Sequence, residues 1–332
     1  MLCRNPYQVA GTLLLHPCGQ CLNCRLNKRR QWTHRLMLEA AQHSEACFVT
    51  LTYSEECLPR SSSGMPTLDP EDLKNWLKRL RISLQRLNAK APLVKSSTLE
   101  RLNTTLRSEY RGLRIWSPTF VGKLNADRKF RFYAVGEYGS RTERPHYHVL
   151  LFGYPNCENG RSRFAKRAYG CCPSCNLILS TWGKGLVDVA EFNQHTAQYC
   201  AQYVVKKMTR PDDPRLGDRF PEFARMSMRP GIGHDAMFDL ADTVLKYDLE
   251  APKELRHGSR RWPLGRYLSR KLLEMTGQEN DLSSYTEEMR VLHEDAKASK
   301  AVSGKALYLS RTARKAQSQV KMARIRKRNE TL

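Results

Sequence analysis

The sequence lacks the features that direct a chain into or across a membrane: it contains no apolar run of roughly 18 residues and no secretory signal. It also lacks a phosphate-binding loop, because Gly183-Lys184-Gly185 has neither the preceding loop nor the following Ser or Thr. The eight alternating strand–helix units of a barrel hydrolase are absent as well. We therefore expect a cytosolic protein that is not a P-loop motor.

Acidic residues are scarce beside basic ones. The 332 residues include 33 Asp and Glu against 56 Lys and Arg, a formal net charge of +23. Such a charge suits a polyanionic partner, with nucleic acid the first candidate and an anionic membrane surface the weaker one. Residues 297–332 contain eleven Lys or Arg and one acidic residue, Glu330. We expect this tail to contact the partner, and a solvated tail without a specific role is the alternative.

Most of the eleven cysteines fall into two groups. A chain of this size without a secretory signal is more typical of thiols or metal sites than of disulfides. Thiolates at two-residue spacing fit one tetrahedral zinc ion, whereas an iron–sulfur run needs a further cysteine followed by proline. Structural zinc is therefore expected as one alternative for each group, and free thiols are the other. The candidate ligands are Cys3, Cys18, Cys21 and Cys24, and then Cys157, Cys171, Cys172 and Cys175.

Apolar periodicity divides the chain into elements. Asp69-Pro70 is a typical helix start, and the residues from Leu73 to Leu84 form an apolar stripe behind it. The predicted helices cover 24–43, the segment after Asp69, and 192–208. The predicted strands cover 48–53, 130–136, 146–152 and 186–189. Between them we expect an insertion at 88–128, a cysteine-containing excursion at 153–176 and an irregular region at 209–260.

Two histidines flank one hydrophobic residue in the third predicted strand. Side chains alternate along a strand, so His146 and His148 share a face and can bind one divalent metal. Glu137 ends the preceding strand, and a hairpin would bring it within roughly 5 Å of His146. Two imidazoles and a carboxylate suit Mn²⁺ or Mg²⁺ with positions open for phosphate oxygens. The alternative is a strand with solvent-facing histidines, and a Glu137 that pairs with Arg141 or Arg144.

The last predicted helix carries two tyrosines one turn apart. A phenol near a lysine and a divalent metal can act as a nucleophile, because positive charges favour the phenolate. Tyrosines that only pack are the usual alternative, which the helix geometry disfavours. At 100° per residue, Tyr199, Tyr203, Lys206 and Lys207 fall on one side, away from the core, and Cys200, Ala201, Val204, Val205 and Met208 fall on the other.

In chain order the sequence shows Phe-Val-Thr-Leu-Thr-Tyr at 48–53, Arg-Pro-His-Tyr-His at 144–148 and Tyr-x3-Tyr-x2-Lys at 199–206. This order resembles the three motifs of HUH endonucleases that act as replication initiators. The paired tyrosines resemble the two-tyrosine initiators of small single-stranded DNA phages. The cysteine run 18–24, Gly-Glu-Tyr-Gly at 136–139, Pro-Gly-Ile-Gly at 230–233 and Pro-Leu-Gly-Arg-Tyr at 263–267 resemble the gokushovirus replication initiation proteins of the Microviridae. The resemblance covers residues 1–275.

The resemblance implies an α+β fold: an antiparallel central sheet of about five strands with flanking helices. It implies a rolling-circle initiator that nicks single-stranded DNA at the viral origin, leaving a 5′-phosphotyrosine link and a free 3′-OH. The implied segments are a basic, cysteine-containing one at 1–45, the nuclease core at 46–208, an extension at 209–296 and the tail at 297–332. The implied roles are metal ligation by His146, His148 and Glu137 with Mg²⁺ or Mn²⁺, nucleophilic attack by Tyr203 and Tyr199, phosphate positioning by Lys206, and DNA contacts from Arg141, Arg144 and Lys207.

Tyr203 is expected to attack first, because Lys206 follows it by three residues whereas Gln202 follows Tyr199. Without a motor of its own, the initiator would need a host helicase and polymerase in the cytoplasm of a bacterial host. The alternative from another class is a non-catalytic, zinc-containing DNA-binding or packaging protein. That alternative explains the charge and the cysteines, but leaves the ordered histidine and tyrosine motifs to chance.

Overall fold

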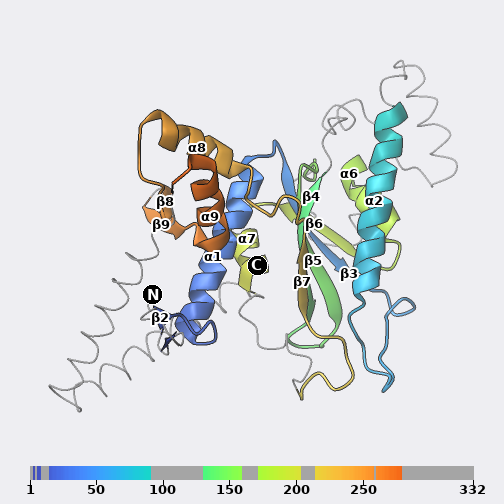
Figure 1. The fold of residues 1–332 in the computed structure, drawn as a ribbon. Helices are drawn as coiled ribbons and strands as arrows, with labels where there is room; N and C mark the ends of the chain where they lie inside the picture. The colour runs from blue at the N-terminus through green and yellow to red at the C-terminus, as the bar shows by residue number, and fades with distance from the viewer. Residues whose placement is uncertain are drawn as a thin grey trace, which may run out of the picture. The chain divides into compact units, whose positions relative to one another are not determined.

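The fold is described from a computed structural model, which describes residues 3, 6–8, 15–90, 130–158, 171–202, 214–257 and 259–278 (Figure 1). The chain forms two compact units. The first comprises Met1–Gln31 with Leu240–Leu332, and the second comprises Trp32–Asp239. The basic tail and nearly all of the predicted insertion lie outside the described residues. The segment boundaries expected from the sequence stay predictions.

The second unit is built around a five-stranded sheet in which every neighbouring pair is antiparallel. The strand order is β6-β3-β5-β4-β7, so β3 pairs with β5 although α2 and β4 lie between them in the sequence. The α+β fold with about five antiparallel strands is thereby confirmed. The strands are β3 (Ala46–Thr52), β4 (Arg131–Tyr138), β5 (Pro145–Phe152), β6 (Val187–Glu191) and β7 (Phe223–Met226).

One face of the sheet packs on α2 (Pro70–Lys90) and α6 (Pro173–Trp182), as Figure 1 shows. The predicted start of α2 is confirmed, because the Asp69 carboxylate accepts a hydrogen bond from the Glu71 backbone N–H at 2.9 Å. The apolar stripe of α2 is buried, and the residues of β3 alternate between buried and partly exposed. The buried stripe comprises Leu73, Trp76, Leu77, Leu80 and Leu84.

The opposite face packs on α7 (Gln194–Gln202) and on the second-unit part of α1 (Leu22–Ala41). Glu39 ties α1 to the sheet: its carboxylate is 2% exposed and pairs with the Arg131 guanidinium, His43 and the Gly233 N–H. A buried carboxylate is tolerated only with such partners. This face carries the candidate site, because Leu36, Ala197 and Cys200 pack beside it but leave its end open to side chains of α7.

The first unit contains short strands and the start of α1. Leu264, Leu268 and Leu272 are fully buried and form the apolar side of its last helix. Its elements are β1 (Tyr7–Gln8), β2 (Leu15–His16), β8 (Glu254–His257), β9 (Arg260–Pro263) and α9 (Gly265–Thr276), while α8 (Ala236–Lys246) begins in the second unit. The prediction of an irregular region at 209–260 was wrong where β7, α8 and β8 form. Among the described helices, none is long and apolar enough to cross a membrane.

Candidate metal centre and tyrosine

The candidate ligands come from the hairpin of β4 and β5. In its register Glu137 pairs with His146 and Val135 with His148. Alternation therefore places Glu137, His146 and His148 on one face of the sheet, as the sequence predicted. The hairpin loop between them is closed by a bond from the Gly139 N–H to the Arg144 carbonyl at 3.1 Å.

Both imidazoles meet a single carboxylate oxygen. Oε1 of Glu137 lies 2.7 Å from Nε2 of His146 and 3.0 Å from Nε2 of His148. The three ligand atoms all lie within 4.8 Å of one another. Glu137 and His148 are buried, whereas the His146 side chain is 16% exposed. Two nitrogens and an oxygen converging at the edge of solvent form a donor set that fits one Mn²⁺ or Mg²⁺ ion with positions left open.

Each imidazole is oriented by a contact on its far side. Nδ1 of His146 lies 3.0 Å from the Arg144 carbonyl oxygen. A carbonyl only accepts, so Nδ1 carries the proton and Nε2 is the nitrogen left for a metal. Nδ1 of His148 lies 3.0 Å from the Thr50 hydroxyl, and the Phe48 ring stacks on the imidazole at 5.3 Å and 13°. Partners of this kind hold metal-binding histidines in place.

Glu137 is ionised in this setting. Burial opposes the charged form, but hydrogen bonds from His146 and His148 outweigh it and hold the pKa of the Glu137 carboxyl well below its ordinary value. A carboxylate is the form that binds a cation. The side chain therefore offers a negative charge at the centre of the group.

Tyr199 reaches the same carboxylate from α7. Its hydroxyl lies 3.2 Å from Oε1 of Glu137 and 3.2 Å from Nε2 of His148, and its ring meets the His148 imidazole edge to face at 4.8 Å. Cys200 and Ala201, predicted for the opposite side of the helix, are fully buried. Tyr199 is itself half-buried and packs against the apolar face of the sheet, so it is directed at the ligands and not into open solvent.

The other predicted site residues are not brought to this point. Tyr203, Lys206 and Lys207 lie outside the described residues. Arg141 is exposed in the hairpin loop. The Arg144 guanidinium pairs with Glu55 at 2.9 Å and donates to the Tyr53 carbonyl at 2.8 Å, so the alternative pairing of Glu137 with Arg144 was wrong.

Thr50 and Phe48 were missed by the sequence analysis. The alternation of the first predicted strand already placed them on one face. Their link to His148 depends on β3 lying beside β5, a pairing between residues 98 apart, which local sequence pattern does not indicate.

The structure also gathers the cysteines of both predicted groups. The sulfur atoms of Cys3, Cys18, Cys21 and Cys24 lie within 4.8 Å of one another, and so do those of Cys157, Cys171, Cys172 and Cys175. Cys47, Cys57 and Cys200 belong to neither group.

Comparison with known proteins points to phage replication. Residues 94–208 match the family model of the ORF2-type replication-associated proteins. The chain is 28% identical over 275 residues to the replication-associated protein ORF2 of Spiroplasma virus 4, covering 82% of this chain and 72% of that protein. It is 26% identical over 197 residues to the replication-associated protein VP4 of Bdellovibrio phage phiMH2K, covering 59% of this chain and 50% of that protein.

A third relative is the replication-associated protein ORF4 of Chlamydia phage 1, 22% identical over 249 residues, with 74% of this chain and 52% of that protein covered. The chain thus spans about half the length of two of these three relatives. No solved structure matches the chain. The resemblance inferred from the motifs is confirmed, and the chain is a relative of the replication-associated proteins of Microviridae phages.

Proposed function

We propose that this protein initiates rolling-circle replication by nicking and rejoining single-stranded DNA at the viral origin. One observation carries the proposal. The Tyr199 hydroxyl lies 3.2 Å from both Glu137 Oε1 and His148 Nε2, so a nucleophile from one element meets candidate metal ligands from two others. The names of the relatives, all replication-associated proteins, support the same role.

The reaction is a transesterification in which the tyrosine replaces the sugar oxygen. The Tyr199 hydroxyl gives up its proton, and its oxygen forms a new bond to the scissile phosphorus. The bond from phosphorus to the 3′ oxygen breaks, and that oxygen takes up a proton to become the free 3′-OH. A divalent cation held by Glu137, His146 and His148 would supply positive charge beside the phosphate oxygens.

The second tyrosine extends the reaction. Tyr203 lies one helical turn beyond Tyr199, and we propose that the two alternate, since a phosphotyrosine on one occupies the site. A second cut after one circle would let the enzyme rejoin the ends. Lys206 and Lys207 are proposed to position phosphates, and Arg141 in its exposed loop to contact DNA. Arg144 is proposed for this role with its existing bond to Glu55 in competition.

The proposed function includes partners. The +23 net charge supports electrostatic binding to DNA. Strand separation and synthesis would fall to a helicase and a polymerase of the bacterial host, in its cytoplasm.

The decisive experiment is incubation of the full chain with labelled single-stranded origin DNA, with and without Mn²⁺. We expect a covalent adduct that forms only with the metal. His146→Ala with His148→Ala should abolish it and leave DNA binding largely intact. His195→Ala is the matched control, because this exposed histidine of α7 lies outside the group. Cleavage by the double variant at the parental rate would refute the metal assignment.

The identity of the nucleophile is tested by mapping the DNA-linked peptide by mass spectrometry. We expect adducts on Tyr199 and on Tyr203, and none when both are changed to Phe. Tyr203→Phe is predicted to remove most of the first adduct, and Tyr199→Phe to nick but not rejoin. The contact of Tyr199 with the ligands supports a larger share for Tyr199. Tyr247→Phe, at a 61% exposed tyrosine, is the control.

The second candidate function is non-catalytic DNA binding or packaging with structural zinc. The two four-cysteine groups favour it. It predicts salt-sensitive DNA binding without any adduct under any metal, so the same incubation separates it from the nuclease.

A further inference from the structure

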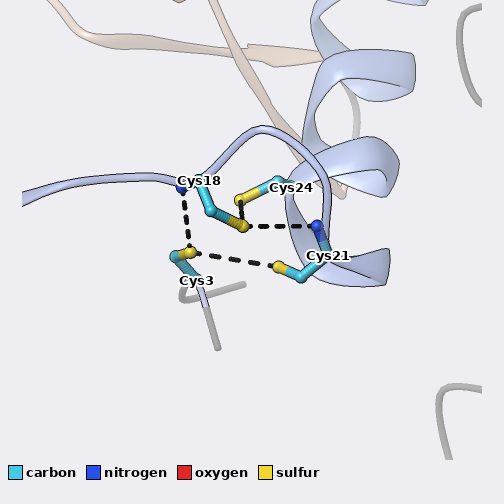
Figure 2. Close-up of side chains that lie close together, drawn as sticks. All are labelled: Cys3, Cys18, Cys21 and Cys24. Atoms are coloured by element: carbon cyan, nitrogen blue, oxygen red, sulfur yellow. Dashed lines mark hydrogen bonds between the residues drawn. The ribbon is translucent and has the colours of Figure 1, made fainter. Parts of the chain in front are cut away.

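The N-terminal cysteine group lies where three segments of the first unit meet. Cys3 precedes β1, Cys18 follows β2, and Cys21 and Cys24 lie at the start of α1. Figure 2 shows the four side chains converging at the N-terminal end of this helix. All eleven cysteines lie in the part of the chain that the structure describes, and each is a free thiol.

The distances match a tetrahedral zinc centre. Four sulfur ligands at about 2.3 Å from one zinc ion lie about 3.8 Å from one another. The sulfur of Cys3 lies 3.9 Å from that of Cys21, and the sulfur of Cys18 lies 4.0 Å from that of Cys24. A disulfide requires about 2.05 Å, so these four sulfurs are spaced as ligands and not as bonded pairs.

The backbone supports the same arrangement. The N–H of Cys18 points to the sulfur of Cys3 at 3.2 Å, and the N–H of Cys21 to the sulfur of Cys18 at 3.3 Å (Figure 2). Such bonds stabilise thiolates, the form that binds zinc. Four thiolates outweigh the charge of the ion, and both the N-terminus of α1 and the basic residues Arg25 and Lys28 lie close in sequence to offset the excess.

We propose that Cys3, Cys18, Cys21 and Cys24 bind one structural zinc ion that joins the β1–β2 hairpin to the start of α1. The hairpin has only two paired residues in each strand, Tyr7 with His16 and Gln8 with Leu15. So short a ladder is not stable by itself. The ion supplies the tie that the small hairpin lacks, and all four of its positions are filled by protein, which makes the site structural and not catalytic.

The second cysteine group carries a separate proposal on its own geometry. Cys157 follows β5, and its sulfur lies 3.6 Å from that of Cys171. Cys172 caps the N-terminus of α6 and Cys175 lies in its first turn, with both residues buried in the core. A second zinc ion held by these four cysteines would join the end of β5 to the start of α6 across a segment outside the described residues.

Metal content of the full chain tests both proposals. Protein produced with zinc and dialysed should contain two zinc ions per chain. Cys21→Ser and Cys157→Ser should each contain one, and Cys57→Ser, at an exposed cysteine outside both groups, should contain two. No zinc in the parent, iron with visible absorption, or two zinc ions in Cys21→Ser would overturn the first proposal. Two zinc ions in Cys157→Ser would overturn the second.

A measurement on the unaltered chain covers the case in which a variant fails to fold. Alkylation followed by peptide mapping should modify Cys57 at once and spare the half-exposed Cys18 and Cys21 until a strong chelator is added. Equal rates with and without chelator would contradict the N-terminal site. An intact mass lower by two disulfides would show that these cysteines oxidise and bind no ion. Neither readout depends on nuclease activity.

Discussion

The Glu137 group on the sheet and the N-terminal cysteine group differ in what holds them. Glu137, His146 and His148 lie on paired strands, and each has hydrogen-bond partners within the protein. The four cysteines lie on a short hairpin, a loop and a helix start, and the closest described contacts among them are those of the cysteines themselves.

The donor sets differ in the same sense. Three nitrogen and oxygen ligands leave room for phosphate oxygens, whereas four sulfurs close a tetrahedron. Shape at the first site is therefore set by the protein and used by the metal. Shape at the second is set by the metal and used by the protein. The predictions below test this contrast.

Metal removal should separate the two groups most strongly. With a strong chelator, amide hydrogen exchange in residues 15–30 should rise on the order of 10³-fold, because the binding free energy of a structural zinc is folding free energy. Exchange in β4 and β5 should change little, since Glu137 keeps its histidine partners. Equal increases in both segments would break the contrast.

The sheet side should depend on its own buried contacts. Glu39→Gln should lower the free energy of unfolding by about 3 kcal/mol, because it leaves Arg131 and His43 without their carboxylate. Burial opposes ionisation of Glu39, but its bonds to His43, the Gly233 N–H and Arg131 prevail and lower its pKa. Denaturant unfolding at neutral pH measures the loss.

The pH dependence of that loss has a definite sign. A carboxyl whose pKa is lowered by folding stabilises the protein above its unfolded pKa of about 4.3, and this contribution falls away as the pH drops through the folded value. The gap between parent and Glu39→Gln should therefore be widest at neutral pH and narrow below about pH 4. A gap that widens in acid would contradict the assigned contacts.

Thr50→Val sharpens the contrast at a single hydrogen bond. It removes the partner of His148 Nδ1, and we expect Mn²⁺ affinity to fall roughly 10- to 100-fold in a titration. Thr52→Val is the matched control from the same face of β3, because the Thr52 hydroxyl bonds to the Leu186 carbonyl and not to a histidine. Similar losses in both variants would indicate a general effect on the strand.

The smallest effect concerns the tail. Removing the residues after Ala296 should reduce the salt dependence of DNA affinity by roughly 0.7 to 0.9 log units per log unit of salt for each lost phosphate contact. Cleavage at low salt should persist. Binding isotherms over a salt series measure the slope, and an unchanged slope would show that the tail makes no phosphate contact.

The sequence predicted the candidate metal group well because its determinants are local. Alternation placed His146 and His148 on one face, and a short loop placed Glu137 across from them. The helix period likewise separated Tyr199 from the buried Cys200. These relations need only the geometry of one hairpin and one helix.

What the sequence could not predict depends on distant pairings. The contact of Tyr199 with Glu137 requires α7 to pack on the sheet. Strand β7 was missed because its four residues, partly exposed or exposed throughout, show no alternation, and only pairing with β4 makes them a strand. The insertion and the tail lie outside the described residues, so their predicted roles stay predictions.

The hairpin that carries Glu137, His146 and His148 also has a consequence for the order of folding. These ligands span a sequence separation of only 11, whereas Thr50 is 98 residues from His148 and Tyr199 is 62 from Glu137. An isolated hairpin closes in about 1–10 μs, while distant pairings wait for larger loops to close. We therefore expect the ligands to meet early on the folding pathway and the tyrosine to arrive late, so that the nascent chain acquires its cation-binding group before it acquires a nucleophile.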